Sequence, residues 1–136
     1  MIFVDTGAFV GRYIERDQHH RAATAAWRQI ERERSRLVTS KHVLDETFTL
    51  LGRRAGNGFA AERARSVFAS RLLEIHRPGA DLERSALDLF EKYADQQVTF
   101  TDCLSFALMK EGGIRRAFTF DGHFRIAGFD VWPGVV

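Results

Sequence analysis

The chain opens with Met1-Ile2-Phe3-Val4-Asp5-Thr6-Gly7-Ala8-Phe9, and this stretch decides the fold. Its apolar residues are consecutive rather than alternating, which predicts a strand that is buried on both faces of a parallel sheet. Such a strand has no favourable place for a charge, so Asp5 marks the point where the chain leaves the sheet. In open α/β sheets the carboxyl ends of the strands form the ligand crevice. Asp5 is therefore a candidate site residue, although an aspartate at this point can equally cap the next helix.

Length and composition are those of an ordinary globular protein. The chain has 136 residues, of which 45% are hydrophobic and 28% are charged, so we expect a single domain over residues 1–136. No apolar run approaches the ~20 residues of a membrane span, and no secretory signal is expected. The one cysteine, Cys103, excludes an intramolecular disulfide and a cysteine-based zinc site. We therefore expect a cytoplasmic protein.

The charged residues are unevenly chosen. There are 20 basic and 18 acidic residues, for a formal net charge of +2, and 17 of the basic residues are arginine. Arginine is the better bidentate partner for phosphate, which favours a nucleic-acid ligand. A GC-rich genome would produce the same bias without a functional reason, so composition leaves both interpretations open.

Strands and helices are expected to alternate along the rest of the chain. Short apolar runs predict further strands over 37–39, 73–76, 117–120 and 131–132. Helical spacing predicts helices over 8–13, 21–34, 41–51, 60–72, 82–93 and 102–109, with Ser40, Asp81 and Thr101 as N-caps and Gly52 near a helix end. Such alternation predicts a parallel sheet with helices on both faces.

Two acids are awkwardly placed on these helices. At ~100° per residue, Glu46 falls at the margin of an apolar helix face, whereas Asp45 points to solvent. A carboxylate at the edge of a core costs several kcal/mol unless it meets a cation or hydrogen-bond donors. Asp102 begins a helix that is apolar nearly all round, with Ser105 one turn later on the same face. The helix dipole favours an acid in a first turn by ~0.3–1 kcal/mol, which explains why Asp102 is tolerated but not why it lies so close to the core.

A later strand repeats the opening pattern. Phe118-Thr119-Phe120 is followed at once by Asp121 and a glycine. His123 is a weaker candidate for the same crevice, because loop histidines are commonly incidental. His19 and His20 are not spaced like metal ligands, so we interpret them as solvated loop residues.

The carboxyl ends of parallel strands share one edge, so four acids are expected to converge there: Asp5, Glu46, Asp102 and Asp121. Four carboxylates in one pocket repel each other unless a cation neutralises them. Because the expected ligands are all oxygen, the ion should be Mg²⁺ or Mn²⁺ rather than Zn²⁺. Such an ion can activate water and stabilise the charge of an in-line displacement at phosphorus. The remaining surface would be basic, as a nuclease requires.

These residues together resemble the PIN domain, and above all the VapC-type toxins of bacterial and archaeal toxin–antitoxin pairs. The resemblance covers essentially the whole chain and is carried by four motifs in order: residues 4–9, Glu46-Thr47, Thr101-Asp102 and residues 118–124. It implies an α/β fold, a PIN-like three-layer α/β/α sandwich around a central, mainly five-stranded parallel sheet.

The resemblance also implies function. It implies a Mg²⁺- or Mn²⁺-dependent endoribonuclease that acts on RNA, forms a homodimer and is inhibited by a cognate antitoxin. By position, the metal-binding catalytic acids would be Asp5, Glu46, Asp102 and Asp121. The hydroxyls that orient these acids or a water would belong to Thr6, Ser105 and Thr119.

Three alternatives fit part of the pattern. A PIN nuclease in housekeeping RNA processing would share all four acids, but the short chain without a further RNA-binding module favours a toxin. A phospho-receiver signalling domain needs an aspartate at the end of a middle strand and a lysine after the last strand, whereas the second strand ends in Thr39-Ser40 and no lysine follows Lys110. A metal-free protein-binding module would gain no stability from Mn²⁺.

Overall fold

The computed structural model describes residues 1–134. Its strands are β1 (Ile2–Val4), β2 (Leu37–Ser40), β3 (Leu73–His76), β4 (Arg116–Thr119) and β5 (Asp130–Pro133). Its helices are α1 (Thr6–Tyr13), α2 (His20–Glu33), α3 (Lys41–Ala55), α4 (Asn57–Ala69), α5 (Ala80–Lys92), α6 (Phe100–Glu111) and α7 (His123–Ile126). The single domain over 1–136 remains a prediction, and its last residues, 135 and 136, lie outside the described part. Across residues 1–134, no helix has the length and apolar character that crossing a membrane requires.

The sheet is parallel throughout, with β1 at its centre. The strand order is β3-β2-β1-β4-β5, and every residue of β1 is buried. Val4 pairs with Phe118 of β4, and the amide of Asp5 donates to the carbonyl of Phe118 at 3.0 Å. The chain therefore leaves the centre of the sheet beside the end of β4, which confirms the interpretation of the opening stretch.

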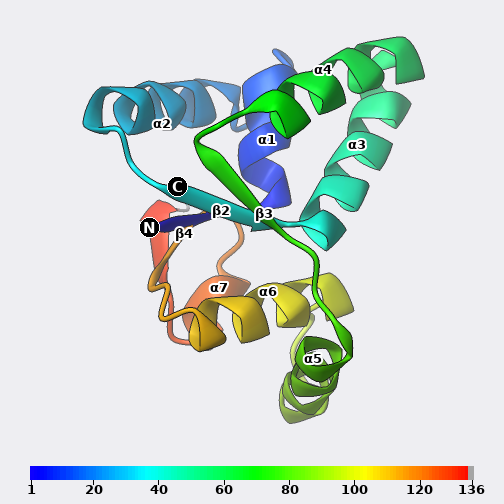
Figure 1. Ribbon diagram of the computed structural model, residues 1–136, viewed down its shortest axis with the longest axis vertical. Helices are drawn as coiled ribbons and strands as arrows, with labels where there is room; N and C mark the ends of the chain where they lie inside the picture. Colours follow the sequence, from blue (N-terminus) through cyan, green and yellow to red (C-terminus); the bar gives the residue numbers. More distant parts are fainter. Residues whose placement is uncertain (135–136) are drawn as a thin grey trace.

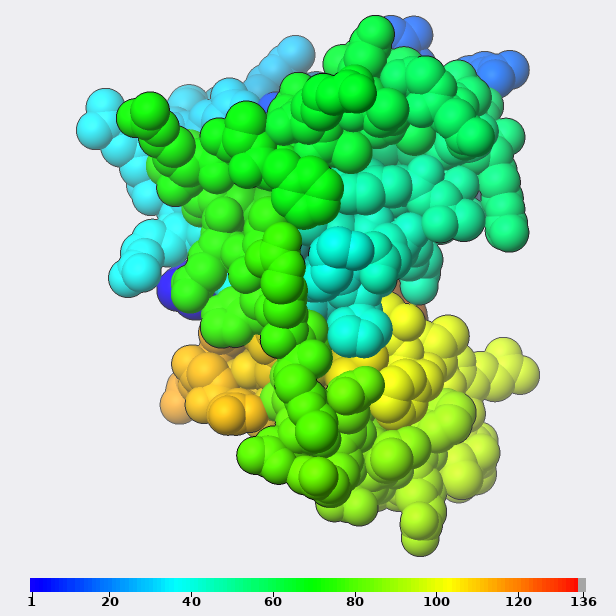
Figure 2. Space-filling model, turned by 45° about the vertical axis from the view of Figure 1, so that its right-hand side comes forward, coloured from blue at the N-terminus to red at the C-terminus, as the bar shows by residue number. Residues whose placement is uncertain are grey.

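Helices cover both faces of this sheet (Figure 1). Helices α1 to α4 lie on one face and α5 to α7 on the other, so the predicted α/β/α sandwich is confirmed. The main core fills both interfaces, and its largest fully buried side chains include Phe3, Phe9, Phe106, Phe118 and Phe124. In Figure 2 the green segment that carries β3 runs down the outside of the molecule from α4 to α5, joining the two layers of helices.

The helix that carries Asp102 is buried as predicted but begins earlier than predicted. Residues 103–109 are all buried. The N-cap is Thr99 rather than Thr101, because Thr99 and Asp102 form a capping box, in which each side chain accepts a hydrogen bond from the other residue's amide. Ser40 is the N-cap of α3, as predicted. Gly79, not Asp81, is the N-cap of α5.

The hairpin of α3 and α4 differs from the expectation in two respects. Helix α3 continues through Gly52, where the missing side chain leaves room for the side chain of Asn57. Helix α4 begins at Asn57 and ends at Ala69, and Phe68 and Leu72 are 46% and 61% exposed. Helix α4 packs against α3 through residues that include Ala60 and Val67, and Phe68 contacts Phe48 of α3 edge-on from its exposed position.

Candidate active site

A hollow of about 360 Å³ opens at the carboxyl edge of the sheet, where β1 and β4 end. We call it the acidic hollow, because its lining includes all four predicted acids: Asp5, Glu46, Asp102 and Asp121. They come from the end of β1, from α3, from the first turn of α6 and from the segment after β4. Thr6, Thr119 and His123 line the same hollow. The sheet topology thus brings together acids that are up to 116 positions apart, as Asp5 and Asp121 are.

Asp5 occupies the N-cap position of α1, yet its side chain makes no capping hydrogen bond to the residues described. Instead its Oδ2 accepts a hydrogen bond from the hydroxyl of Thr119 at 2.7 Å. The same hydroxyl oxygen accepts a hydrogen bond from the amide of Asp121 at 3.0 Å. Thr119 therefore links the ends of β1 and β4 and holds the carboxylate of Asp5, a residue that lines the hollow.

Asp5 is the most deeply buried of the four acids. The residue is only 9% exposed. Burial raises the pKa of Asp5 from 3.8 to about 7, against the hydrogen bond from Thr119, which lowers it. The charges of Asp102 and Asp121 raise the pKa further. A carboxylate in this position is ionised at neutral pH at a considerable cost unless a positive charge is close.

Asp102 is held at the rim of the hollow by the start of α6. Its Oδ2 accepts a hydrogen bond from the amide of Thr99 at 3.0 Å, so part of the carboxylate has a structural role. Burial nevertheless raises the pKa of Asp102; the hydrogen bond from Thr99 lowers it, while the charges of Asp121 and Glu46 raise it. Asp102 is therefore both a helix-capping group and a member of the acid cluster.

Asp121 is oriented by its own loop. Its Oδ1 accepts a hydrogen bond from the amide of His123 at 2.9 Å, and the imidazole Nδ1 of His123 lies 2.9 Å from the same oxygen. Asp102, Asp121 and His123 can each offer a ligand atom within 4.8 Å of the others, the one such group among the described residues. The structure thus places His123 in the crevice, beside the acids.

Glu46 and Ser105 are placed differently from the other predicted residues. Glu46 lines the hollow but is exposed, so the expectation that it lies at the edge of the core is wrong. Thr47, the next residue, is the one buried against the core. Ser105 is fully buried, does not line the hollow, and donates its hydroxyl to the carbonyl of Thr101 at 3.1 Å.

Comparison with known proteins identifies the family. The PIN domain family matches this chain over residues 2–130. The chain belongs to the PIN domain family. The 23S rRNA-specific endonuclease VapC20 of Mycobacterium tuberculosis is 37% identical to it over 129 residues, which cover 95% of each chain. A VapC ribonuclease of Archaeoglobus fulgidus is 30% identical, over 97% of this chain and 85% of the relative.

Solved structures agree with this PIN assignment. The crystal structure of Mycobacterium tuberculosis VapC20, described as a Sarcin-Ricin loop cleaving toxin, superposes with a TM-score of 0.86 at 34% identity, covering 95% of this chain and 96% of that one. The DNA-bound VapBC of Salmonella typhimurium gives a TM-score of 0.68 at 16% identity, covering 96% and 95%. At that identity the second match shows the fold alone.

The residues of this PIN domain fit a divalent cation. Three carboxylates and an exposed fourth surround one hollow, and the hydroxyl of Thr6, only 6% exposed, has no hydrogen-bond partner within residues 1–134. A buried polar atom without a partner is costly, and a hydrated cation would provide one. The acids supply oxygen ligands, and His123 is already engaged with Asp121, so the donor set suits a hard ion.

Sequence reasoning missed two histidines. His20 is not a solvated loop residue, because its Nδ1 lies 2.8 Å from the carbonyl of Gly11. His19 lines the acidic hollow, with its ring stacked on that of Phe120. His19 and Phe120 are 101 positions apart in the sequence. No local sequence pattern marks this contact or the contact of His20 with Gly11.

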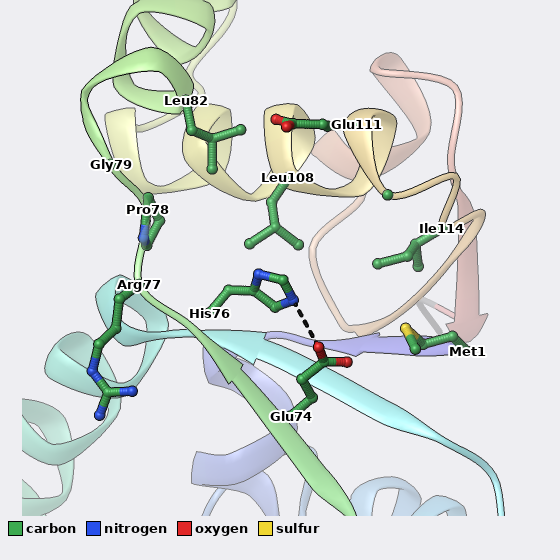
Figure 3. Close-up of a pocket in the computed structure, with 11 residues that line it drawn as sticks. Met1, Glu74, His76, Arg77, Pro78, Gly79, Leu82, Leu108, Glu111 and Ile114 are labelled. Atoms are coloured by element: carbon green, nitrogen blue, oxygen red, sulfur yellow. Dashed lines mark ion pairs between the residues drawn. The ribbon is translucent and has the colours of Figure 1, made fainter.

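A larger cavity of about 500 Å³ lies elsewhere in the PIN fold, between β3 and the helices α5 and α6. Figure 3 shows Leu82, Leu108 and Ile114 directed into it, beside an ion pair in which Nε2 of His76 lies 3.3 Å from Glu74. The acid cluster of the described residues is in the smaller hollow. We therefore identify the candidate active site by its cluster of acids and not by the volume of the cavity.

Proposed function

We propose that this protein is a Mg²⁺- or Mn²⁺-dependent endoribonuclease and the toxin of a toxin–antitoxin pair. The observation that carries the proposal is the convergence of Asp5, Glu46, Asp102 and Asp121 on one hollow, with burial raising the pKa of Asp5 to about 7. Such a cluster is favourable in its ionised form only around a cation. Hard ions with oxygen ligands are the usual partners of phosphate chemistry.

RNA is the proposed substrate because two relatives are named as RNA-cleaving enzymes, one a 23S rRNA-specific endonuclease and the other a ribonuclease. The chain carries 20 basic residues against 18 acidic ones, so the surface outside the hollow attracts a polyanion once the cluster is neutralised. 23S rRNA is the first substrate to test. A homodimer and a cognate antitoxin partner are part of the same proposal, by family resemblance.

The proposed roles of the side chains follow from their hydrogen bonds. Asp5 and Asp102 are the principal ligands, Asp121 and Glu46 complete the set, and the bound ion would supply an activated water and stabilise the developing charge. Thr119 holds Asp5 at 2.7 Å, and the Thr99 amide holds Asp102 at 3.0 Å. Groups that orient ligands in this way affect metal affinity strongly.

Two hydroxyls have less direct roles in this proposal. Thr6 lines the hollow, and its unpartnered hydroxyl would donate to a water or to a phosphate oxygen. Ser105 would act through the first turn of α6, because its hydroxyl bonds to the carbonyl of Thr101, beside Asp102.

A cleavage assay tests the activity. The purified protein is incubated with 23S rRNA and with a DNA of the same sequence, in Mg²⁺, in Mn²⁺ or in EDTA. We expect cleavage of the RNA at defined positions, only with the metals, and no cleavage by Asp5→Asn. Cleavage in EDTA, or full activity of Asp5→Asn, would overturn the proposed mechanism.

Expression separates the toxin role from housekeeping RNA processing. A toxin should arrest growth when it is expressed alone, and co-expression of an adjacent gene should relieve the arrest. Harmless expression of a protein that cleaves RNA in vitro would favour the housekeeping role. Sequencing of RNA 5′ ends after expression would then identify the target.

A further inference from the structure

One pair of aromatic rings in the acidic hollow has no role in the chemistry proposed above. The imidazole of His19 and the ring of Phe120 are stacked, with centroids 4.3 Å apart and planes within 4° of parallel. His19 precedes α2 and Phe120 follows β4, immediately before Asp121. Both residues line the hollow together with Asp5 and Asp121. Aromatic surface therefore borders the acid cluster directly.

The ring of His19 is available for a ligand. His19 is the N-cap residue of α2, but its side chain makes no capping hydrogen bond to the described residues. Within residues 1–134 its ring nitrogens form neither a hydrogen bond nor an ion pair. Both rings of the pair are half-buried rather than enclosed in the core. The stacking contact thus leaves part of the aromatic surface open to the hollow.

The loop that carries His19 is held firmly in place. Asp17 accepts a hydrogen bond from the amide of His19 at 3.0 Å and pairs with Arg54 of α3 at 2.6 Å. Burial alone would raise the pKa of Asp17, but the hydrogen bonds from Arg54 and from the His19 amide hold it below its ordinary value. The carboxylate therefore stays charged and keeps the loop tied to α3.

Phe120 is supported from behind. It contacts Phe118 of the core edge-on, with centroids 6.1 Å apart. Gly7 lies beside the Phe120 ring with room for one methyl group, since an added Cβ would lie 3.7 Å from it, an ordinary contact distance. Rings that are fixed before binding lose little freedom when a ligand stacks on them.

We propose that His19 and Phe120 form a stacking platform for one unpaired nucleobase next to the scissile phosphate. This inference rests on the proposed ribonuclease function. Proteins recognise unpaired RNA bases by stacking them on aromatic side chains, histidine included. The acids of the hollow repel phosphates except through a cation, so affinity for the RNA must come from groups beside the cluster. A base on the platform would place its own phosphate against Asp121 and Asp5.

The main test combines protein variants with altered RNA. His19→Ala should lower kcat/KM by about 5- to 150-fold, the range that base–aromatic stacking supplies, and His19→Phe should retain activity within about threefold because a flat ring remains. His76→Ala is the matched control, since His76 lies outside the acidic hollow. Urea unfolding checks that each variant is folded.

The altered RNA carries an abasic nucleotide on one side or the other of the mapped cleavage position. One of the two substitutions should reduce cleavage by the wild-type protein about as much as His19→Ala does. It should cause no further loss in His19→Ala, because both changes remove the same contact. Independent, multiplying losses would overturn the platform, and so would a folded His19→Phe that is as impaired as His19→Ala.

A binding experiment separates this inference from the proposed function. Asp5→Asn is mixed with a set of short RNAs of 23S rRNA sequence, each carrying 2-aminopurine at one position, and quenching of the fluorescence reports stacking. We expect quenching with Asp5→Asn and not with Asp5→Asn/His19→Ala. Quenching without any cleavage by the wild type would support the platform and refute the nuclease, whereas cleavage without quenching would refute the platform alone. The absence of both quenching and cleavage would refute the platform and the nuclease together.

Discussion

Replacing Asp5 by asparagine should stabilise the metal-free protein at alkaline pH, although it should abolish activity. The pKa of Asp5 is raised from 3.8 to about 7, chiefly by burial. The folded protein therefore retains a proton that the unfolded chain loses, so the free energy of unfolding falls as the pH rises from about 4 to about 7 and is level above that. At ~1.36 kcal/mol per pH unit, the wild type loses about 4 kcal/mol over this range.

Asparagine carries no charge, and its carbonyl oxygen can still accept the hydrogen bond from Thr119. The amide group needs a new acceptor, which costs part of the gain. We therefore expect Asp5→Asn to be more stable than the wild type by about 2–4 kcal/mol at pH 8. The difference should shrink to about 1 kcal/mol or less at pH 4.5.

Urea unfolding in EDTA at the two pH values measures this difference. Asp45→Asn is the control, since Asp45 is exposed and pairs with Lys41 on the surface of α3; its stability should change little between the two pH values. Added Mn²⁺ should stabilise the wild type and leave Asp5→Asn unaffected. An Asp5→Asn that is no more stable than the wild type at pH 8, or equally stabilised at both pH values, would refute the argument from the buried charge.

Three further substitutions probe the groups around the hollow. Thr119→Val removes the hydroxyl that donates to Asp5, so the apparent Mn²⁺ affinity, measured as the metal dependence of cleavage, should fall about 10- to 100-fold; an unchanged metal dependence would contradict this role. Thr99→Ala breaks the capping box with Asp102, so the free energy of unfolding in urea should fall by about 1 kcal/mol and cleavage activity should fall too. A loss of stability with unchanged activity would show that Thr99 acts only as a helix cap. Glu46→Gln should raise the Mn²⁺ concentration needed for cleavage without changing the unfolding midpoint, because Glu46 is exposed; a shifted midpoint would show a structural role instead.

The two strands that end at Asp5 and Asp121 were predictable because their signals are local. Three consecutive apolar residues before Asp5 predict a doubly buried strand, and the repeat before Asp121 predicts a second one. The structure pairs these two strands directly. The apolar character of residues 103–109 likewise predicted a buried helix, and all seven are buried.

The remaining errors have physical causes. The spacing of apolar residues placed Glu46 at the margin of the apolar face of its helix. Residues at such a margin can border the core or be exposed to solvent, and Glu46 is exposed. The cap of α6 was readable in the Thr99-Phe100-Thr101-Asp102 string as a capping box. The stacking of His19 on Phe120 depends on two loops meeting in space. No periodicity reports such a contact.

Anomalous scattering from a crystal soaked in Mn²⁺ tests the central claim most directly, because it locates the ion relative to the acids. We predict a manganese peak in the acidic hollow, within bonding distance of Asp5 and Asp102, and no such peak in Asp5→Asn. A peak at another place, or the absence of any peak in the hollow at millimolar Mn²⁺, would contradict the proposal that these acids hold the catalytic ion.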